Sequence, residues 1–187
     1  MYSLLNRFFS HAHLLRPVSI NCSVAIILTR EASPRLFLIE RARRKGDPWS
    51  GDMAFPGGKK SPDDDSLVET ARRETKEESS IVLPFVPDSL RIRDRITKSH
   101  NSPQPMTITP FVFSVDKPLP AIPNHEVASC HWVELKTLKE SKRQKMLWRI
   151  GRMKIPVSYI PIGEKRLWGL TLSMVDELLI LLDQQRL

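Results

Sequence analysis

The sequence predicts one α+β domain built around a mixed β-sheet. Its 187 residues are enough for one well-cored domain and few for two. The apolar fraction of 41% and the charged fraction of 27% are those of an ordinary globular protein rather than a disordered chain. Strand-like segments and about three helical segments follow one another without strict alternation, which favours a mixed-sheet sandwich over a regular series of βαβ units.

Five segments have the composition and the alternation of β-strands. They are residues 21–29, 35–41, 90–97, 106–115 and 127–135. In the third segment the alternation places Arg91, Arg93 and Arg95 on one face. Between the second and third segments, residues 41–58 form a loop punctuated by Gly and Pro, with a short apolar piece at 53–55.

Three segments are predicted to be helical. Helical periodicity runs from Asp64 to Ser79, and a Lys-rich helical piece covers residues 136–150. The end of the chain, residues 169–185, is amphipathic, and Thr171 is its predicted N-cap.

The net charge of +8 favours anionic partners, which include phosphorylated small molecules, nucleic acid and acidic lipid. The two cysteines, Cys22 and Cys130, lie in apolar runs and are predicted to be buried thiols in a reducing compartment. No apolar run approaches the roughly 20 residues that span a bilayer, so a soluble protein without a membrane partner is expected.

The first 30 residues contain no Asp or Glu and carry Arg7, Arg16 and Arg30. This pattern favours an N-terminal amphipathic extension over residues 1–16, followed by a single domain over residues 17–187. A cytoplasmic protein is then expected. The alternative is a mitochondrial transit peptide, which would place the protein in mitochondria.

The first predicted helix carries a cluster of carboxylates. On a helical wheel its apolar face is followed by Glu74 and Glu78 at the edge, with Glu77 just beyond them. That face consists of Leu67, Val68, Ala71 and Thr75. Buried carboxylates are costly, and a hard divalent cation such as Mg²⁺ would compensate them. Salt bridges to basic residues elsewhere would do so too, and periodicity alone leaves both readings open.

Spacing adds a family resemblance. The segment "RETKEESSI" (73–81), preceded by Gly57-Gly58, resembles the signature of the Nudix hydrolases. The segments "MAFPGG", "TITPFVF", "NHEVASCHWVEL" and "RLWGLT" resemble other parts of that family, so the likeness covers roughly residues 18–183. The resemblance implies a Nudix-type α/β/α sandwich with a mixed β-sheet.

Within the family, "WSGDMAFPGG" and "RLWGLT" are most similar to the coenzyme A pyrophosphatase-like branch. Three positions depart from the pattern. Ser80 replaces the usual Gly after the helix, Thr75 occupies an apolar position, and Asp47 stands where that branch has a spaced Arg.

The resemblance implies a metal-dependent pyrophosphatase with Mg²⁺ or Mn²⁺, acting on a nucleoside-diphosphate-linked small molecule such as coenzyme A. The implied catalytic residues are Arg73, Glu74, Glu77 and Glu78. Glu74 and Glu78 would be the main metal ligands, Glu77 would assist a second ion, and the Gly58 carbonyl would contribute an oxygen. Arg73 would orient the carboxylates.

Several further residues have two readings. Glu126 is an accessory candidate for metal support or base chemistry, or else a turn residue that bonds the backbone. Asp64 is expected to cap or brace the catalytic helix. The run Arg41, Arg43, Arg44 and Lys45 would bind substrate phosphates, or else form a solvated surface.

A second class of function remains open at this point. The basic charge and the Lys-rich stretch 136–154 also suit a Nudix-fold protein that binds RNA or acts on it. Cap, dinucleotide and nucleotide-sugar hydrolysis use the same chemistry with other leaving groups, and the sequence predicts no oligomeric state.

Overall fold

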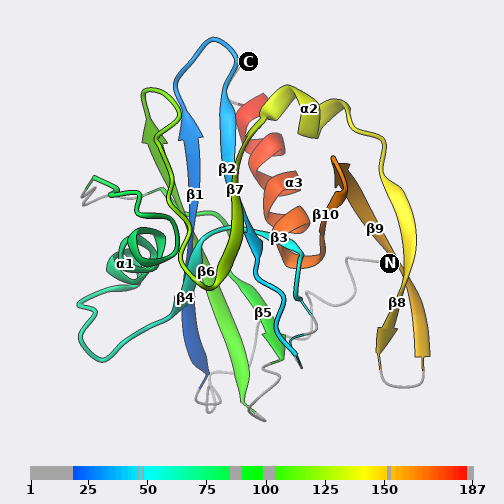
Figure 1. Ribbon diagram of the computed structural model, residues 1–187, viewed down its shortest axis with the longest axis horizontal. Helices are drawn as coiled ribbons and strands as arrows, with labels where there is room; N and C mark the ends of the chain where they lie inside the picture. The colour runs from blue at the N-terminus through cyan, green and yellow to red at the C-terminus, as the bar shows by residue number, and fades with distance from the viewer. Residues whose placement is uncertain are drawn as a thin grey trace.

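The structure of the protein is a computed structural model, which describes residues 19–45, 47, 49–84, 90–98, 104–150 and 153–184. The predicted N-terminal extension, residues 1–16, lies outside the described residues. Figure 1 shows one large sheet with a helix on each side, and a smaller sheet beside the C-terminal helix.

The described residues form two sheets and three helices. The larger sheet has seven strands: β1 (Ile20–Thr29), β2 (Arg35–Arg41), β3 (Met53–Ala54), β4 (Gly57–Lys59), β5 (Arg95–Lys98), β6 (Pro105–Val115) and β7 (Val127–Glu134). The smaller has three: β8 (Gln144–Ile150), β9 (Met153–Ile162) and β10 (Lys165–Trp168). The helices are α1 (Leu67–Ser79), α2 (Leu135–Glu140) and α3 (Gly169–Gln184).

The larger sheet is mixed, as predicted. Strand β1 runs parallel to β6 along its whole length and antiparallel to β2 and β4. Because β6 occupies one edge of β1, the strands β4 and β2 share the other edge. Strand β4 pairs with residues 22–24, and β2 pairs at Leu28. The Gly57–Lys59 backbone is therefore part of the sheet, next to its central strand.

Alternating side chains of β1 enter two separate cores. Ala25 and Ile27 pack in a cluster that includes Ala71 of α1. Ile26 and Leu28 pack in a second cluster that contains residues of α3. A strand buried on both faces reads as a continuous apolar run. Helix α1 covers one face of the sheet and α3 the other (Figure 1), so the predicted α/β/α sandwich is confirmed.

The predicted helix over residues 136–150 is wrong beyond Glu140. Helix α2 ends there, and β8 begins at Gln144. In β8 the side chains of Met146 and Trp148 are half-buried while their neighbours are exposed, which is the period of a strand. The indole of Trp148 packs against that of Trp168, with ring centroids 4.2 Å apart.

Two further boundaries differ from the prediction. Helix α3 begins at Gly169, whose φ is +61°, so Thr171 lies inside the helix and is not its N-cap. In the segment 90–97 only the residues from Arg95 onward form a strand, and Arg91 makes an isolated bridge to Phe111.

Both cysteines are free thiols; Cys22 is buried and Cys130 is half-buried. Among the helices that the structure describes, none combines the length and the apolar character that crossing a bilayer requires.

Candidate active site

Helix α1 is fixed at both ends by serine. At the N-terminus the Oγ of Ser66 accepts a hydrogen bond from the Glu69 N–H (3.3 Å). At the C-terminus Ser80 adopts the left-handed conformation that is usually taken by Gly, with φ 61°, and its N–H donates to the Lys76 carbonyl. The helix packs on β1 and β4. It therefore presents its carboxylate edge to the Gly57–Gly58 backbone.

Glu78 is a buried carboxylate on the inward edge of α1. Only 4% of the residue is exposed, and its Oε2 accepts a hydrogen bond from the Gly57 N–H (2.8 Å). Among the described residues, no Lys, Arg or His lies within ion-pair distance of it. Burial raises the pKa of Glu78 to about 7, against an ordinary value of 4.5. The prediction that this carboxylate points into the protein is confirmed.

Glu74 lies one turn earlier, directly over Gly58. A Cβ at Gly58 would overlap the Glu74 carboxylate, and a Cβ at Gly57 would overlap the Ser23 carbonyl. Only glycine allows this approach of helix and strand. Burial raises the pKa of Glu74, and Arg73, whose Nη2 lies 2.9 Å from the carboxylate, partly opposes that rise.

Arg73 connects the carboxylates to the loop before the helix. Its guanidinium contacts Asp64 (2.9 Å), Glu74 (2.9 Å) and Glu77 (3.1 Å), and it donates to the Lys59 carbonyl. The hydrogen bonds from Arg73 hold the pKa of the Asp64 carboxyl well below its usual range. Asp64 also accepts from the Ser61 N–H and the Thr70 hydroxyl. It braces the helix, in agreement with the prediction.

The donor groups fit a hard divalent cation that keeps part of its water. Glu74 and Glu78 are the two inward carboxylates, and the Gly58 backbone lies against Glu74. The Glu77 side chain is 53% exposed and bonded to Arg73. Within the described ranges no three acidic, His or Cys side chains form a complete chelating set. Two carboxylates, with the predicted Gly58 carbonyl, would leave coordination positions for water, which is how Mg²⁺ is usually bound.

Of the four predicted phosphate-binding cations, the structure brings two to this site. Arg41 faces Glu78 closely enough that its charge opposes the rise in the pKa of that carboxyl. Arg44 forms an ion pair with Glu126 (3.0 Å). Arg43 is exposed over Gly51, and Lys45 is exposed.

Of the two roles considered for Glu126, the structure shows the turn residue that bonds the backbone; metal support or base chemistry stays a prediction. Its backbone is part of the turn before β7, with its N–H bonded to the Asn124 side chain (2.8 Å) and its carbonyl bonded to the Ala42 N–H (2.8 Å). Its carboxylate lies near the site, because its charge contributes to the raised pKa values of Glu74 and Glu78.

Two acidic residues near the site have roles that the sequence did not reveal. Asp47, noted only as a departure from a motif, pairs with Arg41 (2.8 Å). Asp52 is buried, which raises its pKa, and a hydrogen bond with Trp168 opposes that rise. A charged residue between Gly51 and the apolar Met53 was the available signal for Asp52.

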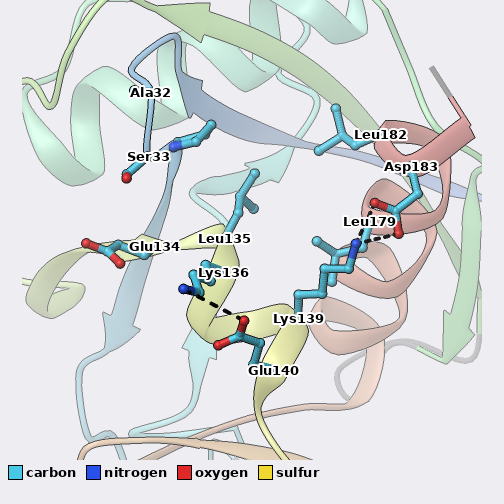
Figure 2. A pocket seen from close by; sticks show the side chains of 11 residues that line it. Ala32, Ser33, Glu134, Leu135, Lys136, Lys139, Glu140, Leu179, Leu182 and Asp183 are labelled. Carbon is cyan, nitrogen blue, oxygen red and sulfur yellow. Dashed lines mark hydrogen bonds and ion pairs between the residues drawn. The ribbon is translucent and has the colours of Figure 1, made fainter. Parts of the chain in front are cut away.

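A cavity of about 390 Å³ lies elsewhere, between the β1–β2 turn, α2 and the end of α3 (Figure 2). Its cations are already paired: Lys139 contacts Asp183 (2.7 Å), and Lys136 lies 4.0 Å from Glu140. It adjoins the start of β2 and the end of β7. Arg41 and Glu126 lie at the opposite ends of these strands, so the cavity is separate from the carboxylate site.

Comparison with known proteins identifies the family. The NUDIX domain family matches residues 21–152 of the chain. The chain belongs to the Nudix family. The Nudix helix is then α1, since the predicted signature residues all lie on it or next to it.

Curated relatives match the chain over part of their length. An uncharacterized Nudix hydrolase, NudL of Yersinia pestis, is 32% identical over 117 residues, which are 63% of this chain and 56% of that protein. An uncharacterized protein of Schizosaccharomyces pombe is 52% identical over 50 residues, which are 27% of this chain and 15% of that protein. The chain therefore spans little more than half of the length of the Yersinia pestis protein and a small part of the length of the Schizosaccharomyces pombe protein.

Solved structures of other Nudix proteins share the fold. The NUDIX domain of Shewanella oneidensis NrtR, solved with ADP ribose, has a TM-score of 0.61 at 15% identity and covers 97% of both chains. A MutT/nudix family protein of Enterococcus faecalis has a TM-score of 0.55 at 16% identity, covering 95% of this chain and 66% of that one. The Nudix-type fold expected from the sequence is thus confirmed.

Proposed function

We propose that the protein is a Mg²⁺- or Mn²⁺-dependent hydrolase that cleaves the diphosphate of a nucleoside-diphosphate-linked small molecule. The observation that carries this proposal is the Glu78 carboxylate, which is buried beside Glu74 and makes no ion-pair contact with a cation among the described residues. An ionised carboxylate that is buried without a cationic partner destabilises the folded protein. Such groups are found at functional sites, where they bind a ligand.

In this proposal each residue of the site has a separate role. The Gly57 N–H fixes one oxygen of Glu78 and leaves the other to bind a ligand. Arg73 holds Glu74 and Glu77 in place, while Gly58 lets the strand approach Glu74. A divalent ion bound by Glu74, Glu78 and the Gly58 carbonyl would stabilise charge on the phosphate oxygens and lower the pKa of a water.

On the substrate side, Arg41 and the Arg44–Glu126 pair border the carboxylates. The guanidinium of Arg41 is only partly used: its Nε is buried and has no acceptor in the described structure. A buried donor without an acceptor costs free energy, and a phosphate oxygen would satisfy it. Arg41 is therefore the first candidate for contact with the diphosphate, and Glu126 is the candidate for accessory metal or base chemistry.

Coenzyme A or a derivative is the leading substrate candidate. The support is the resemblance of "WSGDMAFPGG" and "RLWGLT" to the coenzyme A pyrophosphatase-like branch. These two segments are far apart in the sequence, yet Asp52 of the first hydrogen-bonds with Trp168 of the second. Their contact at one end of the site supports a common role in substrate recognition.

Binding of RNA is the second candidate. Lys145 and Lys154 are exposed on the paired strands β8 and β9, and residues 141–163 contain no Asp or Glu. An RNA-binding role predicts affinity that falls steeply with salt. Diphosphate hydrolysis predicts a requirement for divalent metal at every salt concentration.

The test is a turnover screen with Mg²⁺ and with Mn²⁺. The compounds are coenzyme A, ADP-ribose, dinucleoside polyphosphates, nucleotide sugars and damaged nucleoside triphosphates. The control is Glu78→Gln, which should be at least about 10²-fold slower, as is typical when one acid–base or ligand group is lost. Turnover of no diphosphate by the wild type, or equal turnover by the variant, would refute the proposed function.

A further inference from the structure

Asp47 is built into the mouth of the candidate site by three local contacts. Its Oδ2 pairs with Arg41 Nη2 (2.8 Å), and its Oδ1 accepts from the Trp49 N–H (3.0 Å). Its own N–H donates to the Arg44 carbonyl (3.2 Å). Only 16% of the side chain is exposed. The loop therefore holds a carboxylate against the arginine that is best placed to contact a substrate phosphate.

Three arginines at the site each contact at least one carboxylate. Arg73 contacts three of them, Arg44 contacts Glu126, and Arg41 contacts Asp47. The buried carboxyl of Glu78 has no basic side chain within ion-pair distance among the described residues. In spite of the chain's net charge of +8, the site thus offers little unpaired positive charge of its own to an incoming anion.

We propose that Asp47 is a specificity-determining residue, which pairs with Arg41 so that the site accepts diphosphates esterified at both ends and disfavours those with a terminal phosphate. This inference rests on the proposed function and names the substrate class within it. In the described structure the ion pair with Asp47 involves the Nη2 of Arg41. The other N–H donors of the guanidinium are left for one phosphate oxygen.

The discrimination follows from charge. A phosphate esterified on both sides carries one negative charge near neutral pH, whereas a terminal phosphate carries close to two. With Asp47 beside Arg41, the second negative charge of a terminal phosphate is repelled by the Asp47 carboxylate as well as attracted by the guanidinium. At separations of about 8 Å and effective dielectric constants between those of protein surface and water, one such charge pair changes affinity roughly 3- to 30-fold.

The test compares two ligands of the same nucleoside in wild type and Asp47→Asn. The Asn keeps an oxygen for the Trp49 N–H and removes the charge. The kcat/KM is measured for the diester that the wild type hydrolyses fastest in the screen, together with the competitive Ki of ADP. The expected result is that Asp47→Asn tightens ADP inhibition by a factor about 10-fold larger than the factor by which it changes kcat/KM for the diester, because ADP carries the additional charge.

Asp63→Asn is the matched control, because Asp63 is an exposed carboxylate on the loop before α1 with no arginine contact in the described structure. Asp63→Asn should leave the Ki of ADP and the kcat/KM for the diester as in the wild type. A general effect of net charge would instead change these two constants as much in Asp63→Asn as in Asp47→Asn. Thermal melts confirm that both variants fold. An unchanged ratio of the two constants in folded Asp47→Asn overturns the role of Asp47 while the hydrolase stands. A wild type that hydrolyses no diester overturns the proposed function, and the role of Asp47 with it.

Discussion

The substitution Glu78→Gln tests the candidate site through stability as well as activity. Folding raises the pKa of this buried carboxyl from 4.5 to about 7. The folded protein therefore binds a proton that the unfolded chain releases in this interval. Hence the free energy of unfolding of the metal-free protein falls as the pH rises from about 4.5 to 7, by roughly 3 kcal/mol.

Gln has no charge to bury, so this loss should be absent from the variant. The Gln side-chain oxygen can still accept from Gly57, but its amide leaves a buried donor unpaired, at about 1–3 kcal/mol. At pH 8 in EDTA we expect the variant to be as stable as the wild type or up to about 2 kcal/mol more stable. At pH 4.5, where the wild-type carboxyl is protonated, the variant should be slightly less stable.

Metal should reverse that order at pH 8. An ion at a hundred times its Kd stabilises the protein that binds it by about 2.7 kcal/mol, and Glu78→Gln should lose most of this gain. The measurements are urea and thermal unfolding of both proteins at the two pH values, with EDTA and with Mg²⁺.

Glu69→Gln is the matched control, because Glu69 lies on the solvent side of the same helix and, among the described residues, its carboxylate pairs with Arg72 (2.8 Å). It should change stability by less than about 0.5 kcal/mol and leave the response to pH and metal intact. A large loss of stability in metal-free Glu78→Gln at pH 8, with Mg²⁺ affecting neither protein, would show that the carboxylate is a structural partner and no metal ligand.

Three further predictions concern the same region. Arg41→Ala should raise KM about 10-fold and lower kcat less, because it removes a charge-assisted contact to the substrate in ground and transition states alike; steady-state kinetics measure both. Gly58→Ala places a methyl group on the Glu74 carboxylate and should abolish turnover, whereas Gly163→Ala, whose Cβ would meet nothing within 4 Å, should cost stability only. Ser80→Gly should stabilise the protein by about 0.5–1 kcal/mol in urea unfolding without changing kcat, because Ser at φ 61° is strained.

The strands of the main sheet could be predicted because their signal is local. The segments at 21–29 and 35–41 are apolar and rich in residues that favour strands, and both became strands with nearly those bounds. The segment 136–150 failed for the opposite reason. Its Lys, Glu, Gln and Leu residues favour helix, but β9 pairing and the Trp148–Trp168 contact decide the structure of its second half. No strand was predicted over residues 153–162, so the pairing of β8 with β9 was not expected.

The carboxylates of the candidate site were predictable for two reasons. The helical wheel placed Glu74 and Glu78 toward the protein, and family spacing placed Gly57-Gly58 opposite them. The Asp47–Arg41 pair depends on the path of a turn, and the Asp52–Trp168 contact joins the loop before β3 to the end of β10. Neither contact produces a periodic pattern in the sequence, so neither could be predicted without the tertiary structure.

The division of one β1 edge between β2 and β4 has a consequence for motion at the site. The backbone on both sides of Gly57-Gly58 is bonded to β1: Ala25 N–H donates to the Pro56 carbonyl (2.9 Å), and Lys60 N–H donates to that of Asn21 (2.9 Å). Opening the Gly-Gly segment therefore requires separating it from the central strand of the domain. The Ala25 and Lys60 amides should exchange with solvent deuterium almost as slowly as the protein unfolds as a whole.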